Sequence, residues 1–159
     1  MRLLSRSRLS ARYTLAACAV ALAGCSDPTS PQESELAAAQ SRWRTVSPTS
    51  NSYVMRQQIL CFCAFANSEF VVTVVNGAIT SVVPAVPPQN GLPAPEPRYF
   101  RTIDQLFAEV HGALKKPGTL KEVTYDPVAG YPSRLSLDPV LDAIDDEVAY
   151  VTRGVGPVP

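Results

Sequence analysis

The strongest constraint on the fold is the pair Asn76-Gly77, which separates two runs of mostly β-branched residues at 70–75 and 78–83. Both central residues of a type I′ turn need positive φ, and Asn-Gly meets that need at low steric cost. The pattern therefore predicts an antiparallel hairpin and favours an antiparallel sheet around it.

The period of two along a strand decides which hairpin side chains enter the core. Counting outward from the turn places Val74 opposite Ile79 and Thr73 opposite Thr80. The face expected in the core carries Phe70, Val72, Val74, Ile79 and Val83.

Two capping boxes predict two helices. A hydroxyl residue followed three positions later by Glu or Gln occurs at 30–33 and at 102–105. Each box precedes apolar residues spaced three and four apart, which is the period of an amphipathic helix. We expect helices over 31–46 and 103–114.

The remaining strands are predicted from alternation and β-branched content. They cover residues 53–61, 120–125, 131–137 and 147–153. The link at 84–97 holds six of the 15 prolines and is expected to be extended, because proline removes backbone donors.

The order of these elements gives the fold class. We expect an α+β fold, an antiparallel meander sheet with two helices on one face, built from two helix-strand-strand-strand units. A single domain is expected over 31–153, followed by a frayed tail at 154–159. The other sheet face should be solvated or should bind something.

The N-terminus has the form of an export signal. Four arginines precede an apolar run of 11 residues at 13–23, shorter than the roughly 20 residues that span a bilayer. The run ends in Leu22-Ala23-Gly24-Cys25, which looks like the lipobox of bacterial lipoproteins. We expect a signal peptide over 1–24, a diacylglycerol and an acyl chain such as palmitate on Cys25, and a tether over 25–30.

The balance of basic and acidic side chains limits the classes of partner that the protein can bind. The whole chain has 14 basic and 14 acidic side chains, which excludes a nucleic-acid binder that works through a basic face. Loss of the signal peptide would leave 10 basic against 14 acidic side chains, a net charge of −4. Membrane attachment is then expected through the N-terminal lipid, with the folded domain on the extracytoplasmic side of the bacterial cell envelope.

Several short motifs follow one another in a set order. They are the lipobox, Trp43, Tyr53, Cys61-Phe62-Cys63, Val-x-Val-x-x-Gly-x-Ile at 72–79, Thr102-Ile103-Asp104-Gln105-Leu106-Phe107, Tyr125-Asp126-Pro127, Gly130-Tyr131-Pro132 and Asp146-Glu147. Over residues 36–153 the chain resembles the small bacterial envelope lipoproteins grouped as a domain of unknown function with a Cys-x-Cys element. The resemblance implies a shared fold and location and brings no catalytic residues. A looser likeness, in the order of elements, is to BamE-like and PepSY-like modules.

Cys61 and Cys63 are the two cysteines left once the signal peptide and Cys25 are set aside. In an oxidising compartment a disulfide between them is favoured, although it requires the backbone to leave regular strand geometry. Two alternatives stay open. The pair could be a soft two-thiolate site for copper or zinc, or a redox pair, for which Cys-x-x-Cys at a helix N-terminus is the usual arrangement.

Other chemistry-bearing residues have simpler interpretations. His111 lies at the edge of the second helix's apolar stripe, with no catalytic frame around it. Five carboxylates between 138 and 147 lack the spacing of a calcium loop and favour a solvated acidic turn. Tyr125, Asp126 and Tyr131 form either a polar binding spot or a turn.

The motifs of common enzyme classes do not occur in the sequence: there is no phosphate loop, dinucleotide fingerprint or nucleophile frame. We therefore expect neither catalysis nor a cofactor. The leading expectation is a non-catalytic, lipid-anchored binding or scaffolding module for an envelope protein or peptide, with an exposed strand edge suited to peptide addition. The alternative is thiol-redox chemistry or copper and zinc handling through Cys61 and Cys63.

Overall fold

The computed structural model describes residues 30–86, 95–140 and 143–159. Its elements, in chain order, are α1 (Pro31–Val46), β1 (Tyr53–Leu60), β2 (Glu69–Val75), β3 (Ala78–Pro84), the 3-10 helix η1 (Pro97–Tyr99), α2 (Ile103–Leu114), β4 (Leu120–Tyr125), β5 (Pro132–Leu137) and β6 (Val148–Pro157). The predicted signal peptide, Cys25 and the middle of the proline-rich link lie outside the described residues. Among the helices that are described, none is long and apolar enough to cross a membrane.

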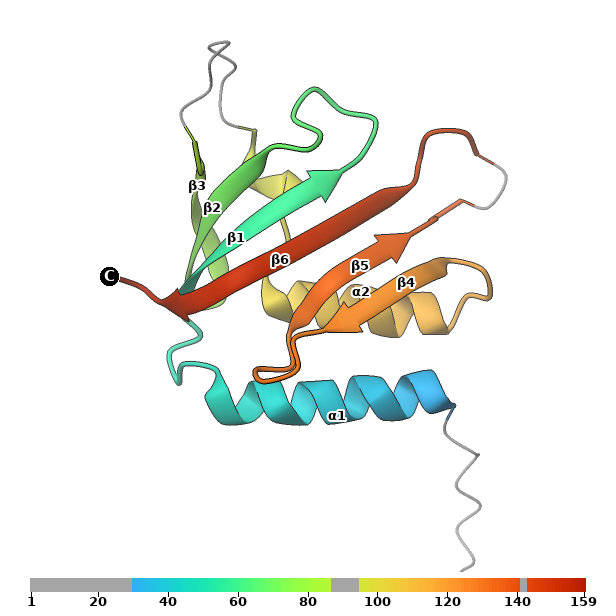
Figure 1. Ribbon diagram of the computed structural model, residues 1–159, viewed down its shortest axis with the longest axis horizontal. Coiled ribbons are helices and arrows are strands. Elements are labelled where there is room, and N and C mark those ends of the chain that lie inside the picture. The colour runs from blue at the N-terminus through green and yellow to red at the C-terminus, as the bar shows by residue number, and fades with distance from the viewer. Residues whose placement is uncertain (1–29, 87–94, 141–142) are drawn as a thin grey trace, which may run out of the picture.

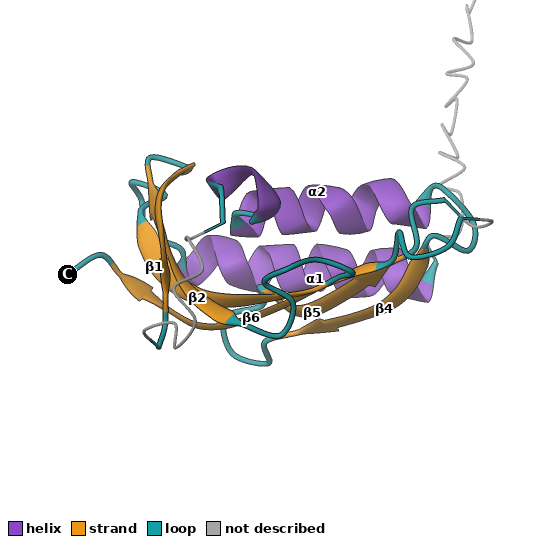
Figure 2. Ribbon diagram, turned by 90° about the horizontal axis from the view of Figure 1, so that it is seen from above, coloured by secondary structure: helices purple, strands orange, loops and turns teal. Residues whose placement is uncertain are grey.

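The six strands form one antiparallel sheet in the order β3-β2-β1-β6-β5-β4. Both helices lie on the same side of this sheet (Figure 2). The predicted α+β class is confirmed, as are the antiparallel meander and the two helices on one face.

The centre of the sheet joins the first strand of the chain to the last (Figure 1). β1, β2 and β3 form one meander and β4, β5 and β6 form another. The first unit contributes its first strand to the junction, whereas the second contributes its last. The two units therefore repeat in the chain without occupying equivalent places in the sheet.

Both helices begin as the capping boxes predict. At α1, Ser30 Oγ accepts a hydrogen bond from Glu33 N at 3.2 Å, and Glu33 Oε2 accepts one from Ser30 N at 2.8 Å. At α2, Thr102 Oγ1 accepts from Gln105 N at 3.2 Å, and Gln105 Oε1 accepts from Thr102 N at 2.8 Å. Each box satisfies two backbone donors at a helix start, where the helix itself offers no acceptor.

The predicted hairpin turn is present. Asn76 and Gly77 have φ of 51° and 79°, the positive values that a type I′ turn needs. The predicted pairing of Val74 with Ile79 is confirmed.

The register beyond that pair was predicted wrongly. Thr73 lies opposite Ser81 and not opposite Thr80, because the ladder is irregular between Thr73 and Val74 and β3 holds one extra residue. An extra residue exchanges the two faces of a strand. Val82 is consequently 8% exposed and enters the core, whereas Val83 is 48% exposed.

The expected frayed tail is mostly strand. β6 continues to Pro157, which pairs with Tyr53 of β1. A register irregularity in this part of the β1–β6 ladder, together with a φ of 63° at Gly154, carries the strand past glycines that do not favour strands. The described fold thus continues to Pro157, beyond the expected end at residue 153.

Aromatic side chains join α1 to the sheet. Trp43 packs edge-on against Tyr53, with ring centroids 5.7 Å apart, and against Tyr131 at 6.1 Å. The Tyr53 hydroxyl accepts a hydrogen bond from Ile103 N at 2.8 Å. Burial raises the pKa of Tyr53 to about 12, so this hydroxyl stays neutral while it holds the start of α2.

The sheet face without helices carries a charge network. Glu69 Oε2 lies 3.0 Å from Arg56 Nη1, and Glu69 Oε1 lies 2.5 Å from Arg153 Nε. Arg56 and Arg153 face each other across β1 and β6, and Glu69 offsets their repulsion. Hydrogen bonds from Arg153 and then Arg56 lower the pKa of Glu69 against the effect of burial.

Candidate functional site

An apolar pocket of about 360 Å³ lies beside the C-terminal ends of α1 and β6. Its walls come from segments far apart in the sequence. They include Trp43 and Val46 of α1, Tyr53 of β1, Ala129 of the β4–β5 loop, and Val155 and Gly156 of β6. The polar groups among these side chains are the Trp43 indole N–H and the Tyr53 hydroxyl, and the hydroxyl is already bonded to α2. The pocket therefore suits an apolar group.

The pocket exists because β6 is longer than its neighbour on one side. β6 pairs with β5 only from Val148 to Val151, yet it pairs with β1 as far as Pro157. Before β5 begins, the loop at 126–131 turns onto α1. Within the described residues, no strand flanks the last part of β6 on this side.

Gly130 allows the β4–β5 loop to touch α1. Its φ is 84°, and a Cβ at this position would lie 2.4 Å from the Ala39 carbonyl oxygen and 2.8 Å from Arg42 Cβ. Glycine alone satisfies both the backbone conformation and the close approach. The contact fixes the wall of the pocket to which Ala129 belongs.

Asp126 shapes the same loop. Its Oδ1 accepts hydrogen bonds from Val128 N at 3.0 Å and from Ala129 N at 2.6 Å, the pattern by which aspartate stabilises turns. Of the two interpretations offered for this residue, turn formation accounts for both contacts.

Tyr125 and Tyr131 pack in different surroundings. Tyr131 is 6% exposed and lies against Trp43. Burial, followed by the charge of Asp126, raises the pKa of Tyr131. Tyr125 instead stacks on Phe107 of α2, with ring centroids 6.4 Å apart. Asp126 and Tyr131 are therefore neighbours, whereas the Tyr125 ring packs against α2.

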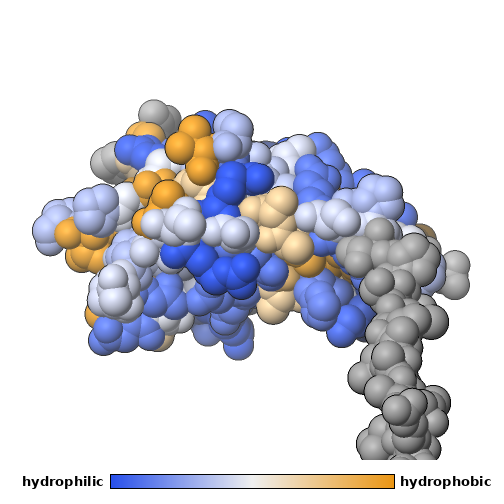
Figure 3. Space-filling model, turned by 90° about the horizontal axis from the view of Figure 1, so that it is seen from below, coloured by the Kyte–Doolittle hydropathy of each residue, from blue (hydrophilic) through white to orange (hydrophobic). Residues whose placement is uncertain are grey.

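Exposed apolar side chains follow the pocket-lining segments. Val46, Val128 and Val158 are 50%, 79% and 39% exposed. Figure 3, seen from below with respect to Figure 1, shows most of the strongly hydrophobic surface of this view toward its left-hand end. Sequence reasoning missed this pocket, because no local signal links the end of α1 to the end of β6.

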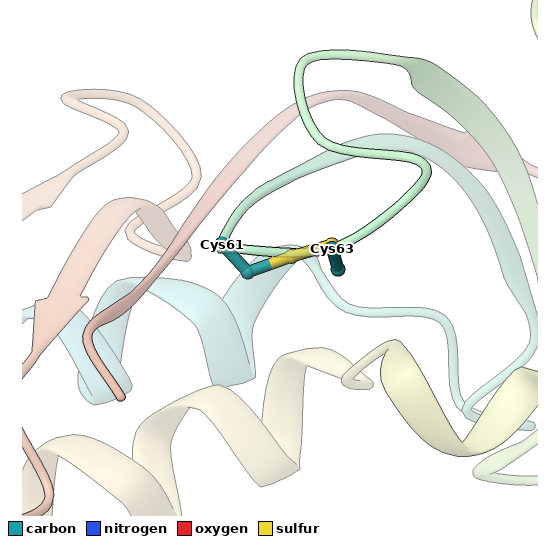
Figure 4. The surroundings of a disulfide bond; sticks show 2 residues. All are labelled: Cys61 and Cys63. Carbon is teal, nitrogen blue, oxygen red and sulfur yellow. A yellow bond between two sulfur atoms is a disulfide. The ribbon is translucent and has the colours of Figure 1, made fainter. Parts of the chain in front are cut away.

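Cys61 and Cys63 are joined by a disulfide at the start of the β1–β2 loop (Figure 4). Their Cα atoms are 5.3 Å apart, within the usual range for such a bond. The chain leaves strand geometry at Cys61, directly after β1. Phe62, between the two cysteines, is 86% exposed, so the bond presents an aromatic side chain to solvent.

Phe65 anchors the rest of this loop. Its ring lies 5.1 Å from that of Tyr99, 6.3 Å from Phe70 and 6.4 Å from Phe100. The backbone of the loop is also held by Gln58, whose Nε2 donates to the Asn67 carbonyl oxygen at 2.8 Å. The disulfide thus lies on a well-supported loop at the surface.

The remaining candidate residues, His111 and the acidic residues of the 138–147 turn, do not form a common site in the described structure. His111 is exposed on α2 and lines an open groove with Trp43 and Phe107. Asp138 is only 7% exposed, and its Oδ2 lies 2.9 Å from Lys121 Nζ. The acidic turn was expected to be solvated, and this residue departs from that expectation. Asp146 Oδ2 accepts a hydrogen bond from Val140 N at 2.8 Å. In the described part of the chain, no three His, Cys, Asp or Glu side chains cluster as metal ligands do.

Residues 35–157 match the family described as "Family of unknown function (DUF6174)". The match covers most of the chain and nearly all of the folded domain, and the protein belongs to this family. No curated protein and no solved structure matches the chain.

Proposed function

We propose that this protein is a lipid-anchored binding module of the bacterial cell envelope, whose folded domain binds a protein or peptide on the extracytoplasmic side. The apolar pocket beside β6 carries the binding role. It combines an apolar lining with a strand end that lacks a neighbour on one side, and both features suit a partner segment.

The lipobox at Leu22-Ala23-Gly24-Cys25 supports the anchor. α1 begins at Pro31, so a lipid on Cys25 would hold the first turn of α1 close to the membrane. The pocket lies at the other end of this 16-residue helix, about 24 Å away at 1.5 Å per residue. The proposed tether and the pocket thus lie at opposite ends of α1.

The anchor is tested by expressing the chain in bacteria fed an alkyne-bearing fatty acid. The wild-type protein should incorporate the label and sediment with membranes. Cys25→Ser should do neither, whereas Cys18→Ser should behave as wild type, because position 18 lies inside the predicted signal. An unlabelled wild-type protein in the soluble fraction would overturn the anchor.

The pocket is tested with the apolar dye 1-anilinonaphthalene-8-sulfonate. Trp43 is the only tryptophan of the chain and lines the pocket, so bound dye should be excited by energy transfer from it. Ala129→Leu should narrow the pocket and weaken the transfer, because Ala129 is one of its lining residues and is half-buried. Gly112→Leu, on α2 with open space around its Cβ, should leave the signal unchanged. Equal transfer in both variants would place the dye elsewhere.

A second candidate function is thiol-redox chemistry or soft-metal binding through Cys61 and Cys63. The position of the disulfide on a surface loop favours it, since both cysteines are only half-buried and Phe62 between them is exposed. Native mass spectrometry of the exported protein tests it. A mass two hydrogens short, unchanged by added copper or zinc, would leave the bond a structural one. Free thiols that hold one metal ion would support the second candidate.

A further inference from the structure

We propose that Val140 and Ile144, in the β5–β6 loop, insert into the surface of the membrane that holds the proposed lipid anchor. This inference rests on the anchoring part of the proposed function and adds the surface by which the domain contacts the bilayer. It is carried by two exposed apolar side chains at the end of the domain where α1 begins.

Val140 and Ile144 are held at the surface by the backbone of their own loop. They are 57% and 89% exposed. Ala143 N donates a hydrogen bond to the Val140 carbonyl oxygen at 2.8 Å, and Asp146 Oδ2 accepts one from Val140 N at 2.8 Å. Large apolar side chains grouped on an exposed loop suit contact with another apolar surface.

The β5–β6 loop leaves the sheet at the same end as the turn between α2 and β4. Leu137, at the end of β5, pairs with Leu120 at the start of β4 and with Val148 at the start of β6. The loop and the turn are also joined directly, because Asp138 N donates a hydrogen bond to the Thr119 carbonyl oxygen at 2.9 Å.

The first turn of α1 lies at this end too. Hydrogen bonds with Ser30 lower the pKa of Glu33, and the charge of His111 adds to this effect. His111 is in the last turn of α2, just before the turn into β4. Figure 1 shows the start of α1, the α2–β4 turn and the β5–β6 loop together at its right-hand end.

The short tether makes a membrane the natural occupant of this surface. Residues 25–29 reach at most about 18 Å when fully extended, so a lipid on Cys25 would keep Ser30 within that distance of the bilayer. A tether of this length also keeps the domain at a high local concentration beside the membrane. Two apolar side chains, which would hold a free protein only weakly, are then enough to orient a tethered one.

Exposed charges of both signs lie near the two apolar side chains. Lys115 and Lys116 follow α2, whereas Asp145 and Glu147 follow Ile144. Because these charges oppose one another, attraction to anionic headgroups does not account for a contact here. We therefore expect the apolar side chains to carry the contact, with similar strength on neutral and on anionic lipids.

The experiment places a polarity-sensitive dye on the acylated full chain, reconstituted in phosphatidylcholine vesicles. In Ile144→Cys the dye has one free thiol to react with, since Cys61 and Cys63 are bonded to each other. Its emission should shift to the blue, and lipids with a quencher near the headgroup should quench it. Val128→Cys is the matched control, because Val128 is 79% exposed in the β4–β5 loop, at the opposite end of the sheet. There the dye should remain in water.

A second probe tests the role of the Ile144 side chain itself. A dye on Val140→Cys should also shift to the blue, and adding Ile144→Asp to that chain should abolish the shift. Val128→Asp, a matched change at the other end, should leave the shift as it was. Both positions are exposed, and thermal melts that coincide would show that the fold is intact.

The outcomes separate this inference from the anchor. An acylated chain whose dye at position 144 stays in water would overturn the inference and leave the anchor standing. A blue shift at position 128 alone would turn the opposite end of the domain toward the membrane. A shift that appears only when phosphatidylglycerol is added to the vesicles would make the contact ionic and overturn apolar insertion. A chain that takes up no fatty acid would remove both proposals.

Discussion

Gln57 pairs its side-chain amide with the backbone of Arg101. Gln57 Oε1 accepts a hydrogen bond from Arg101 N at 2.9 Å, and Gln57 Nε2 donates to the Arg101 carbonyl oxygen at 3.0 Å. The same Nε2 also donates to Thr152 Oγ1 at 3.1 Å. Gln57 is completely buried, so one side chain of β1 joins the entry to α2 with β6.

Replacing Gln57 should be far more damaging than replacing its neighbour. Gln57→Leu removes the three hydrogen bonds and leaves the Arg101 backbone without this partner, which should lower the free energy of unfolding by about 2–4 kcal/mol. Gln58→Leu loses one exposed bond to Asn67 and should change it by no more than about 1 kcal/mol. Urea unfolding of both variants tests this difference, and equal losses would contradict it.

Alanine substitutions at Gly130 and Gly112 should change the stability of the protein in opposite directions. Gly130→Ala would force a Cβ into the Ala39 carbonyl at a positive φ and should destabilise the protein by about 3 kcal/mol or more. Gly112→Ala, in the last turn of α2 with open space around its Cβ, should stabilise it by about 0.5–1 kcal/mol. Thermal melts of the two variants provide the measurement. A stable Gly130→Ala protein would mean that the β4–β5 loop does not pack on α1.

Replacing Tyr53 or Tyr125 with phenylalanine should change the stability of the protein by different amounts. Tyr53→Phe leaves the buried Ile103 N–H without its acceptor and should cost about 1–3 kcal/mol at neutral pH. The Tyr125 hydroxyl is buried without a hydrogen-bond partner among the described residues, so Tyr125→Phe should be neutral or slightly stabilising. Equal costs would be inconsistent with this arrangement.

The same two tyrosines should make the fold sensitive to alkali. Burial raises the pKa of each to about 12, above the value near 10 expected in the unfolded chain. Because the folded-state pKa is the higher one, this stabilisation is complete below about pH 10 and is lost as pH rises toward 12. The free energy of unfolding, measured from pH 8 to pH 12, should fall above about pH 10. It should fall less steeply in each phenylalanine variant.

Glu69 should contribute a modest, salt-dependent stability. Glu69→Gln leaves Arg56 and Arg153 facing each other and should cost about 0.5–1 kcal/mol at low salt, with less effect at 1 M salt. The folded-state pKa of Glu69 is lowered, so its contribution is present above the unfolded pKa and is lost as pH falls through the folded value. Glu96→Gln, in a pair that is exposed on both sides, is the control and should have no measurable effect. A loss that does not change with salt would contradict the ionic account.

The features that could be predicted from sequence are those determined by neighbouring residues. Ser30 with Glu33 starts a helix, and Asn76 with Gly77 makes a turn, because a few side chains and φ values decide each event. The α+β class then followed from the order of such local elements.

The features that were missed depend on residues far apart in the chain. The extra residue in β3 exchanges the sheet faces on which Val82 and Val83 lie, and no residue near the turn indicates it. The strand at 154–157 forms only because β1 is there to pair with it. The pocket needs α1, the β4–β5 loop and β6 in place together, so periodicity alone had no means of revealing it.

The pairing of β1 with β6 makes the order of synthesis matter. The central strand pair closes a loop of roughly a hundred residues, and such long-range pairing forms slowly. A chain that lacks its last 12 residues has lost all of β6, an inner strand, and with it the junction between its two meanders. Translocation of the proposed lipoprotein through a membrane channel would therefore be complete, or nearly so, before the sheet could close, and an unfinished chain would stay in the unfolded form that threading requires.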